Sequence, residues 1–341
     1  MPPTIKDVAI LSGCSIKTVS RVINHEPHVT EETRVRVETA VRATGYIPNL
    51  AARRLVQQKS STLCILVYPG FSQPASDLLT RLLDLAYEES YDVLLQTYYP
   101  TFPKSRRKLV ELAAGKRFDG FVSTPPCDAD GFIADLLATY KVPLVQINPL
   151  SREGPTPYLA GDDELGARLA VQHLLELGHR RIACLRGPRN LRSSADRLAG
   201  YRSALAEAGL VVDPGLVQDS EFTFDGGYTA AHLLIQLADP PTAIYAASDE
   251  AAHGVLFAAQ ELGLSVPGQL SICGHDDLAY SRHIWPGLTT IHQPAEEILE
   301  QAVRLLIDLL KGASVNKTHV VLPPHLVVRG STGSGNFRKD F

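Results

Sequence analysis

Residues 4–24 constrain the fold most, because they predict two short helices joined by a tight turn. Thr4 and Asp7 form a helix-opening capping pattern, and Gly13 ends that helix where a positive φ costs little. Ser15 can cap the second helix, whose inner face holds Val19, Val22 and Ile23 and whose outer face holds Ile16, Lys17, Ser20 and Arg21. Such a pair is typical of a helix-turn-helix that reads DNA, although a plain helical hairpin with a solvated polar face has the same pattern.

A third helix is predicted after Thr30, which can cap it. We expect Val35, Ala40 and Val41 to close a small three-helix core. The first 60 residues hold nine Lys or Arg and five Asp or Glu, a net charge of +4, so the rest of the chain carries −8 of the total of −4. A basic end on an acidic body favours phosphate contact at that end.

The bulk properties narrow the class of protein. A chain of 341 residues should hold two or three domains. We find no uncharged apolar run of about 18 residues that would predict a membrane span, and no secretory signal. The cysteines at 14, 64, 127, 184 and 273 are scattered without a CxxC or Cys/His cluster. Free thiols in a reducing cytoplasm are therefore expected, and neither disulfides nor a metal site.

From residue 63 the chain alternates between strand-like apolar runs and segments of helical periodicity. This alternation predicts βαβ units and parallel sheets. The predicted strands are 64–68, 93–96, 120–123, 144–148, 182–185, 243–247 and 270–273, and the predicted helices are 77–89, 104–114, 164–177, 194–208, 227–238, 250–262 and 295–311.

The α/β texture also raises the possibility of an enzyme. Polar groups follow two predicted strands, as HDD at 275–277 and SDE at 248–250, but no G-x-S-x-G, G-x-x-x-x-G-K-[ST] or H-E-x-x-H motif occurs. Asp and Ser at strand ends lie where open α/β folds bind ligands. Ligand binding without catalysis, cofactor or metal is therefore expected.

The N-terminal stretch resembles the lactose-repressor/galactose-repressor (LacI/GalR) family of bacterial transcriptional regulators. The matching residues are TVSRV at 18–22, Asn24, VT at 29–30, Thr33, GY at 45–46, PN at 48–49, Ala52 and Leu55. The resemblance continues in the body, in LGHRRIACLRGP at 177–188, RLAGYRSALAEAGL at 197–210, SDEAAHG at 248–254, LSICGHDD at 270–277 and PGLTTIHQP at 286–294. It implies a cytoplasmic, homodimeric regulator with a helix-turn-helix headpiece and two Rossmann-like parallel-sheet subdomains of periplasmic-binding-protein type.

The resemblance also implies the domain borders. We expect a headpiece at 1–46, a hinge helix and linker at 47–61, an effector-binding and dimerisation body at 62–330 and a flexible tail at 331–341. Three crossings make each subdomain discontinuous, the N-subdomain comprising 62–161 and 292–322 and the C-subdomain 162–291 and 323–330.

Operator DNA is the implied partner of the headpiece. By the resemblance, residues 16 and 17 read bases, and Leu55 is the hinge leucine that enters the minor groove, which would bend the duplex. From the residues alone, Leu55 could instead dock on the body. The predicted DNA contacts are Ile5, Ser15, Ile16, Lys17, Thr18, Ser20, Arg21, Asn24, His28, Thr30, Thr33, Asn49, Ala52 and Leu55.

A small-molecule effector is the implied partner of the body. The expected contacts are Arg197, Phe222, Ser248, Asp249, Asp276, Asn148, Gln293 and Ala75, the last in loop 68–76. Arg197, expected to open a helix, can fork two vicinal acceptors, Asp276 matches the family aspartate that accepts hydrogen bonds, and Phe222 matches the stacking aromatic. Ser248 lacks the amide of the commoner asparagine, and Asp249 could be a helix cap instead.

These features favour a neutral sugar or glycoside, with a purine, nucleoside or sugar phosphate as the alternative. Induction is expected for a sugar and corepression for a purine. We expect a dimer contact through Leu78, Leu82 and Leu85, and no tetramer, because the tail lacks a leucine heptad. Trp285 could lie at the pocket rim or in the core. A ligand-binding module without DNA function would have no use for residues 1–60.

Overall fold

The computed structural model describes residues 3–23, 27–46, 60–68, 76–315 and 317–334. Its contacts divide the chain into two compact units, Met1–Ser60 and Ser61–Phe341, here called the headpiece and the body. Residues 47–59 of the hinge and linker predicted at 47–61 lie outside the described residues, as does most of the loop at 68–76.

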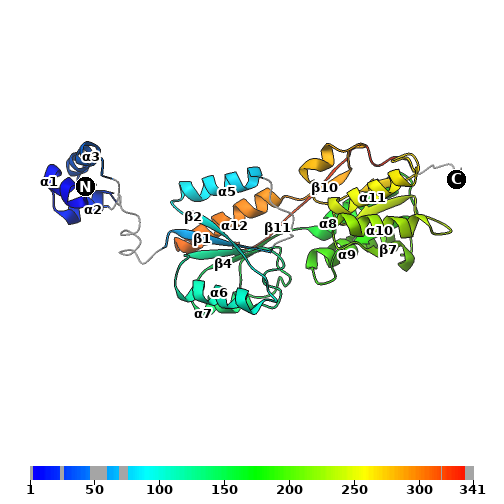
Figure 1. The fold of residues 1–341 in the computed structure, drawn as a ribbon, viewed down its shortest axis with the longest axis horizontal. Helices are drawn as coiled ribbons and strands as arrows, with labels where there is room; N and C mark the ends of the chain where they lie inside the picture. The colour runs from blue at the N-terminus through cyan, green and yellow to red at the C-terminus, as the bar shows by residue number, and fades with distance from the viewer. Residues whose placement is uncertain (1–2, 24–26, 47–59, 69–75, 316, 335–341) are drawn as a thin grey trace. The chain divides into compact units, whose positions relative to one another are not determined.

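The described residues of the headpiece form the helices α1 (Ile5–Ser12), α2 (Ile16–Ile23) and α3 (Glu31–Thr44) (Figure 1). The Thr4 backbone donates to Asp7 Oδ2 over 2.7 Å, which makes the predicted capping box at the start of α1. Gly13 follows α1 in the left-handed conformation, at φ 62°. The Thr18 backbone donates to Ser15 Oγ over 3.1 Å, so Ser15 caps α2 as the sequence predicts.

The headpiece core differs from the prediction at one position. Val35 is 50% exposed, and Val37, fully buried, takes the place expected for it. The reason is helical spacing: Val37, Ala40 and Val41 lie at i, i+3 and i+4 and share one face of α3, whereas Val35 lies off that face. The buried core of the headpiece consists of Val8, Val19, Val22, Val37 and Ala40. Partly buried residues pack around it: Ile5, Ala9, Cys14, Ile23, Val29, Val41 and Tyr46.

The first sheet of the body has six parallel strands in the order β11-β5-β4-β3-β1-β2. Its strands are β1 (Thr62–Val67), β2 (Asp92–Thr97), β3 (Gly120–Ser123), β4 (Leu144–Ile147), β5 (Tyr158–Gly161) and β11 (His319–Leu322). Its helices are α5 (Ser76–Glu88), α6 (Pro103–Ala114), α7 (Phe132–Thr139) and α12 (Ala295–Leu310).

Alternate residues of β1 face opposite sides of this sheet, as strand geometry requires. Leu63 and Ile65 pack with α5 and α12, while Cys64 and Leu66 pack with α6 and α7. Burial on both faces explains why β1 is a continuous apolar run in the sequence and not an alternating one.

The second sheet has four parallel strands in the order β7-β6-β8-β9. Its strands are β6 (Ile182–Arg186), β7 (Val217–Asp219), β8 (Ala243–Ala246) and β9 (Ser271–Cys273), and its helices are α8 (Asp163–Glu176), α9 (Arg192–Glu207), α10 (Phe224–Ile235) and α11 (Asp249–Glu261). One hydrophobic cluster joins the sheet to α8 and α9, and another joins it to α10 and α11. Short 3₁₀ helices lie at Pro214–Leu216 and Ala279–Arg282.

The chain passes between the two sheets three times. It leaves the first sheet after β5, which ends at Gly161, and enters α8 at Asp163. It returns from β10 (Thr290–His292) to α12, and leaves again from β11 to β12 (His325–Val327). β10 and β12 pair in antiparallel fashion. The subdomain borders predicted from the sequence, after residues 161, 291 and 322, stay a prediction, and the second of them would divide β10.

The structure corrects three expectations about the body. Leu82 and Leu85 are buried in its core and cannot be a dimer surface, because α5 turns their face onto the sheet. Trp285 is 96% exposed, which excludes a core position. The predicted tail begins too early: Ser331 is fully buried, and its Oγ donates to the Ile272 carbonyl over 2.6 Å.

All five cysteines are unpaired. Among the described residues, no helix is long and apolar enough to cross a membrane, and no group of three His, Cys, Asp or Glu side chains could hold a metal ion.

Candidate functional site

The candidate DNA interface is the face of α2 that points away from the headpiece core. Val19 and Val22 anchor the helix by burial, while Ile16, Lys17 and Arg21 are exposed. An exposed isoleucine beside two basic residues can contact both a thymine methyl and guanine acceptors. The helix therefore presents a surface suited to the major groove.

Of the other predicted DNA contacts, Ser20 is half-buried on α2. Ser15 Oγ lies 2.9 Å from Thr18 Oγ1, so these hydroxyls pair at the start of α2. Thr30 and Thr33 pair similarly at the start of α3, over 2.8 Å. Ile5 packs against the headpiece core and His28 is exposed. Asn24, Asn49, Ala52 and Leu55 lie outside the described residues, and so does the predicted effector contact Ala75.

The candidate effector site is built around Arg197, which lies in the second turn of α9 and does not open the helix as expected. Its Nε donates to Asp163 Oδ1 over 2.8 Å, its Nη1 donates to the Ala247 carbonyl over 2.5 Å, and its Nη2 lies 3.0 Å from Asp276 Oδ1. Burial lowers the pKa of Arg197, but the charges of Asp276 and Asp163 outweigh burial and raise it above its usual value. The guanidinium is thus a buried, fixed cation at the carboxyl edge of the second sheet.

Asp276 is the second charged group of the site. Burial raises its pKa to about 6, even though the neighbouring Arg197 favours the ionised form. Its Oδ1 faces Arg197, and about a quarter of its side chain remains exposed. A carboxylate with a free lone-pair direction toward solvent can accept a hydrogen bond from a ligand.

Phe222 lies against the backbone of Gly187, just after β6. A Cβ at position 187 would come within 2.1 Å of Phe222 Cζ, so only glycine fits beneath the ring. The Arg197 guanidinium carbon lies 5.2 Å from the ring centroid, within cation–π range. The ring is thus held beside Arg197 and Asp276, where it offers a flat apolar surface.

Ser248 and Asp249 have different roles from those the sequence suggested. Ser248 caps α11, accepting from the Ala251 backbone over 3.2 Å, and Asp249 is not the cap. Asp249 is fully buried and accepts hydrogen bonds from Thr290 Oγ1, Ser281 Oγ and the Leu278 backbone. Burial, together with the charge of Asp276, raises its pKa to about 7. These bonds make Asp249 an anchor for the segments that surround the site.

Gln293 and Asn148 connect this cluster to the first sheet. The Gln293 amide nitrogen lies 2.9 Å from Asp163 Oδ1 and 2.7 Å from His275 Nε2. Asn148 Oδ1 accepts from the Gly161 backbone over 3.0 Å. A Cβ on Gly161 would meet Gln293 Oε1 at 2.5 Å, so Gln293 packs directly on Gly161. All seven described effector candidates therefore lie in this network of contacts or directly beside it.

Two members of this network were not predicted from the sequence. Asp163 accepts from both Arg197 and Gln293. His275 is fully buried, and burial lowers its pKa well below its usual value, so it is neutral and packs between Gln293 and Tyr245. Both residues lie beside strand ends, but their partners are far away in the sequence, so local patterns gave no signal.

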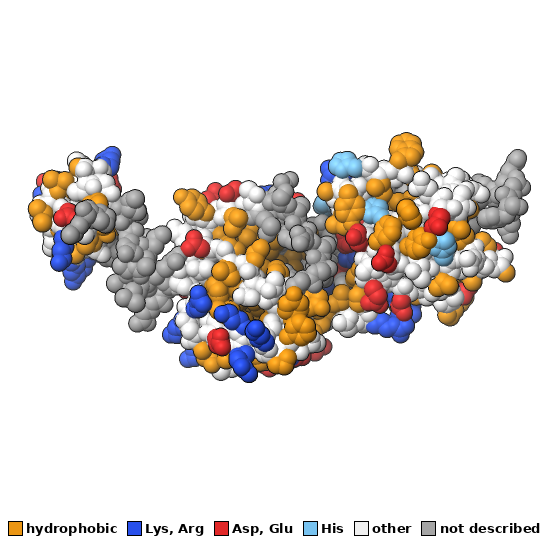
Figure 2. Space-filling view, in the orientation of Figure 1, with side chains coloured by type: hydrophobic (Ala, Val, Ile, Leu, Met, Phe, Trp, Pro, Cys, Tyr) orange, Lys and Arg blue, Asp and Glu red, His pale blue; other side chains and the backbone are white. Residues whose placement is uncertain are grey.

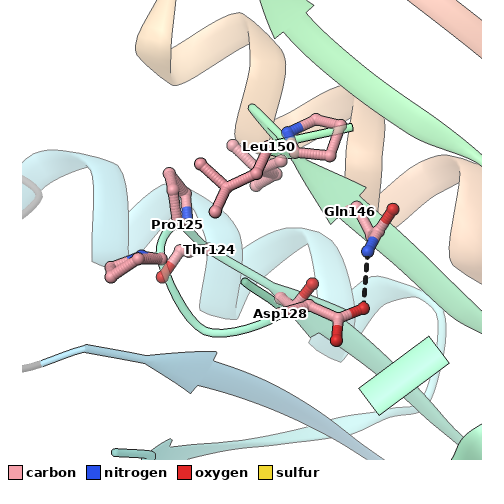
Figure 3. Close-up of a pocket in the computed structure, with 9 residues that line it drawn as sticks. Thr124, Pro125, Asp128, Gln146 and Leu150 are labelled. Atoms are coloured by element: carbon pink, nitrogen blue, oxygen red, sulfur yellow. Dashed lines mark hydrogen bonds between the residues drawn. The ribbon is translucent and has the colours of Figure 1, made fainter. Parts of the chain in front are cut away.

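A small pocket opens at the carboxyl ends of β3 and β4 (Figure 3). Its main polar groups bond within the protein: Gln146 Nε2 donates to Asp128 Oδ2 over 2.8 Å, and the Ile133 and Ala134 backbones also donate to Asp128. Burial raises the pKa of Asp128. Because these bonds serve the start of α7 and the pocket holds no more than about one water molecule, it is not a ligand site.

Comparison with known proteins identifies both units. Residues 4–49 match the model of "Bacterial regulatory proteins, lacI family", and residues 171–332 match the "Periplasmic binding protein-like domain". The chain is 34% identical to the HTH-type transcriptional repressor CytR of Escherichia coli over 96% of both chains. It is also 34% identical to the HTH-type transcriptional regulator CelR of Thermobifida fusca, over 96% of this chain and 98% of CelR.

The chain belongs to the LacI family.

Solved structures agree with this placement. A lac repressor dimer bound to operator and the anti-inducer ONPF has a TM-score of 0.81 at 29% identity, covering 98% of this chain and 100% of that chain. A CelR–cellobiose complex has a TM-score of 0.73 at 31% identity, covering 96% and 99%. This LacI-family chain is therefore a DNA-binding transcriptional regulator, and its close relatives are regulators and not enzymes.

Proposed function

We propose that this LacI-family protein is a repressor that binds a pseudo-palindromic operator as a homodimer and is controlled by a neutral sugar or glycoside. The observation that carries the proposal is the Arg197 centre, in which one buried guanidinium is held between two carboxylates beside an aromatic ring. Vicinal hydroxyls suit such a site, because they donate to carboxylates and accept from the guanidinium.

The electrostatics argue against a phosphorylated effector. Arg197 is the cation at the centre of the site, and Asp163 and Asp276 already neutralise it. A phosphate placed there would face two carboxylates at short range, and like charges in a desolvated site repel strongly. A neutral polyol avoids this repulsion, which is why a sugar phosphate ranks below an unphosphorylated sugar.

The relatives support a saccharide. CelR has been solved with cellobiose, a lac repressor with ONPG, and a LacI-family regulator of Enterococcus faecium with ribose. Another relative, 32% identical, is the ribose operon repressor of Escherichia coli. A purine or nucleoside remains the second candidate, because the flat Phe222 ring could also stack on a base.

For DNA binding, Ile16 and Lys17 contact base edges, Arg21 contacts the duplex beside them, and the remaining predicted headpiece residues position the backbone. The proposed hinge segment 49–56 is short for an isolated helix, and such helices are marginal in water. Its formation is therefore sensitive to the state of the body. For a sugar effector we propose induction, in which the bound effector disfavours the operator-bound state.

Two exposed apolar faces of the body support a homodimer. On α5, Leu83 and Tyr87 are exposed, on the side away from the core. Over α10 and α11, Phe224, Tyr228 and Phe257 form a ring cluster with centroids about 6 Å apart, and Figure 2 shows apolar side chains gathered over these helices. Exposed apolar patches mark interaction surfaces, and a two-fold pair of headpieces fits a palindromic operator.

A thermal-shift screen tests the effector class. Monosaccharides, disaccharides, nucleobases, nucleosides and sugar phosphates would each be added to the purified protein, because a ligand that binds the folded state raises the melting temperature by mass action. Stabilisation by unphosphorylated sugars is the expected result. Stabilisation by purines or nucleosides alone would replace the sugar assignment with the second candidate.

A further inference from the structure

Three aromatic rings lie together at the carboxyl edge of the first sheet, outside the cluster around Arg197. Tyr68 directly follows β1, Tyr99 follows β2 by two residues, and Phe102 directly precedes α6. β1 and β2 are parallel neighbours whose last paired residues are Val67 and Thr97. The two strands therefore deliver Tyr68 and Tyr99 to the same edge, which is where open α/β sheets bind their ligands.

The three rings form a continuous ladder. The Tyr68 and Tyr99 centroids lie 5.9 Å apart at 67°, an edge-to-face contact. The Tyr99 and Phe102 centroids lie 5.0 Å apart at 24°, a stacked contact. Both arrangements are favourable for aromatic pairs, so the rings hold one another in place before any ligand arrives.

The backbone under the ladder is also fixed. The Tyr99 backbone donates to Ser105 Oγ over 3.0 Å, the Phe102 backbone donates to the Tyr99 carbonyl over 3.1 Å, and Arg106 Nε donates to the Pro100 carbonyl over 2.9 Å. The turn between β2 and α6 is thus tied to the first turn of α6. A rigid turn presents the rings with little ordering cost on binding.

Phe102 departs from local rules in a way that its stacking alone does not explain. It occupies the N-cap of α6, where Ser, Thr, Asp or Asn would accept a backbone hydrogen bond, and it makes no such bond. Its side chain is 56% exposed. A local rule broken without evident structural gain is typical of functional positions.

Along the edge, the residues after successive strands change from apolar to polar. In the strand order β2-β1-β3-β4, the first residues after the strands are Tyr98, which is buried, then Tyr68, Thr124 and Asn148, and Tyr99 is the second residue after β2. Asn148 is an effector candidate linked to the Arg197 cluster through Gly161 and Gln293. The aromatic ladder therefore lies at the far end of an edge whose other end joins the proposed effector site.

We propose that Tyr68, Tyr99 and Phe102 form a second subsite that stacks on a further sugar ring, so that the effector is a disaccharide or a longer saccharide. The assignment rests on the proposed sugar effector. The C–H face of a pyranose is apolar and flat enough to cover an exposed aromatic ring, while its hydroxyls stay hydrated. One ring held at Arg197 would leave this ladder uncovered, whereas a second ring would use it.

The test compares affinities by isothermal titration calorimetry in the full-length protein. The panel is glucose, galactose and ribose against cellobiose, maltose and lactose. The wild type is expected to bind one of the disaccharides more tightly than any of the monosaccharides. The variant Phe102→Ser should reduce the ratio of disaccharide to monosaccharide affinity roughly threefold to tenfold, the scale of one lost aromatic contact.

Phe102→Ser is chosen because serine is favoured at an N-cap, so the change should not unfold α6. Tyr140→Ser is the matched control: Tyr140 is also a partly exposed aromatic at an end of a helix, but it precedes β4 and so belongs to the opposite edge of the sheet. The affinity ratio should be unchanged in this control.

Other outcomes separate the two proposals. Equal affinity for disaccharides and monosaccharides, or an equal loss of both in Phe102→Ser, would overturn the second subsite while leaving the sugar effector in place. Binding of an aryl glycoside that depends on Phe102, with no disaccharide binding, would overturn the second-sugar assignment in favour of an aromatic aglycone. Absence of any saccharide binding, with binding of a nucleoside, would overturn the proposed function itself.

Discussion

Arg197 Nη2 and Asp276 Oδ1 lie 3.0 Å apart, in an ion pair that joins α9 to the segment after β9. Asp163, at the start of α8, completes the arrangement from the other side of the guanidinium. Three elements that are distant in sequence therefore meet at one cation. A ligand that engages Arg197 or Asp276 would therefore contact groups that hold these elements together.

Asp276→Asn should weaken effector binding, and with it the effector response, while the protein still binds its operator. The amide keeps the size of the side chain but accepts a weaker hydrogen bond than an ionised carboxylate does. Hydrogen bonds to charged groups contribute about 1.5–3 kcal/mol, which corresponds to about 10- to 150-fold in affinity. Operator binding with and without the identified effector, measured by fluorescence anisotropy, checks this. A variant that responds normally would show that the effector site has been misplaced.

Arg197→Ala should destabilise the body as well as remove effector binding. The buried Asp163 and the half-buried Asp276 would lose their common partner, and breaking a buried pair typically costs about 3–5 kcal/mol. Chemical denaturation followed by circular dichroism measures the loss. Arg304→Ala is the control, because Arg304 pairs with Glu300 on the surface of α12 and exposed pairs contribute about 0–1 kcal/mol. Equal losses in the two variants would contradict the buried-pair account.

Effector affinity should fall as the pH is lowered through about 6, the pKa to which burial raises Asp276. Below that pH the carboxyl is protonated, and the ionised acceptor is lost. Titration calorimetry of effector binding between pH 5 and pH 8 tests this. Asp276→Asn is the control, because its remaining affinity for the effector should not fall as the pH is lowered through about 6. A wild-type affinity that is flat across this range would contradict the role of Asp276 as acceptor.

The ionisation of Asp276 should affect the stability of the fold in the direction opposite to its effect on effector affinity. The folded-state pKa of Asp276 lies above its unfolded value of 3.8, so the folded state holds a proton that the unfolded state has released. The contribution of Asp276 to stability is therefore largest below pH about 4 and declines as the pH rises through about 6. Without ligand, Asp276→Asn should make the melting temperature less dependent on pH in this window. Differential scanning calorimetry measures the melting temperature at each pH. The same pH dependence in the variant and the wild type would contradict this account.

Exchanging Ile16 and Lys17 should change which operator is preferred and not simply weaken DNA binding. Base contacts specify sequence, whereas phosphate contacts position the protein. Selection from a randomised operator library checks the preference. The matched control is an exchange of Val35 and Arg36, an exposed apolar–basic pair on α3, which should keep the original preference. A uniform loss of affinity for every sequence would refute the assignment of residues 16 and 17.

The headpiece prediction that failed explains what a sequence pattern can and cannot supply. Val35 and Val37 have the same side chain in the same helix, yet only Val37 is buried. Periodicity predicts that a helix has an apolar face, but two valines two positions apart cannot both lie on it. Which one faces inward depends on how α3 packs on α1 and α2, and that is a tertiary property.

In the body, too, local patterns predicted the secondary structure but not the tertiary contacts. Seven strands and seven helices were predicted in their order because buried parallel strands are continuous apolar runs. The prediction did not include α7 or the short strands β5, β7, β11 and β12. The burial of Leu82 and Leu85 was not, because an amphipathic α5 does not reveal whether its apolar face meets a sheet or a partner. At the proposed effector site, the resemblance singles out Arg197 and Asp276, but the bonds of Asp163 and His275 span too great a sequence separation for any local pattern to reveal.

The central claim is that effector and operator binding are coupled, and titrating the identified effector with and without operator DNA tests it most directly. Coupling is reciprocal, so an inducer must bind the operator-bound protein more weakly than the free protein, by the same factor by which it weakens operator binding. The account predicts weaker effector binding in the presence of operator. Equal affinity in the two titrations would contradict the coupling, and tighter binding with operator would reverse its sign to corepression.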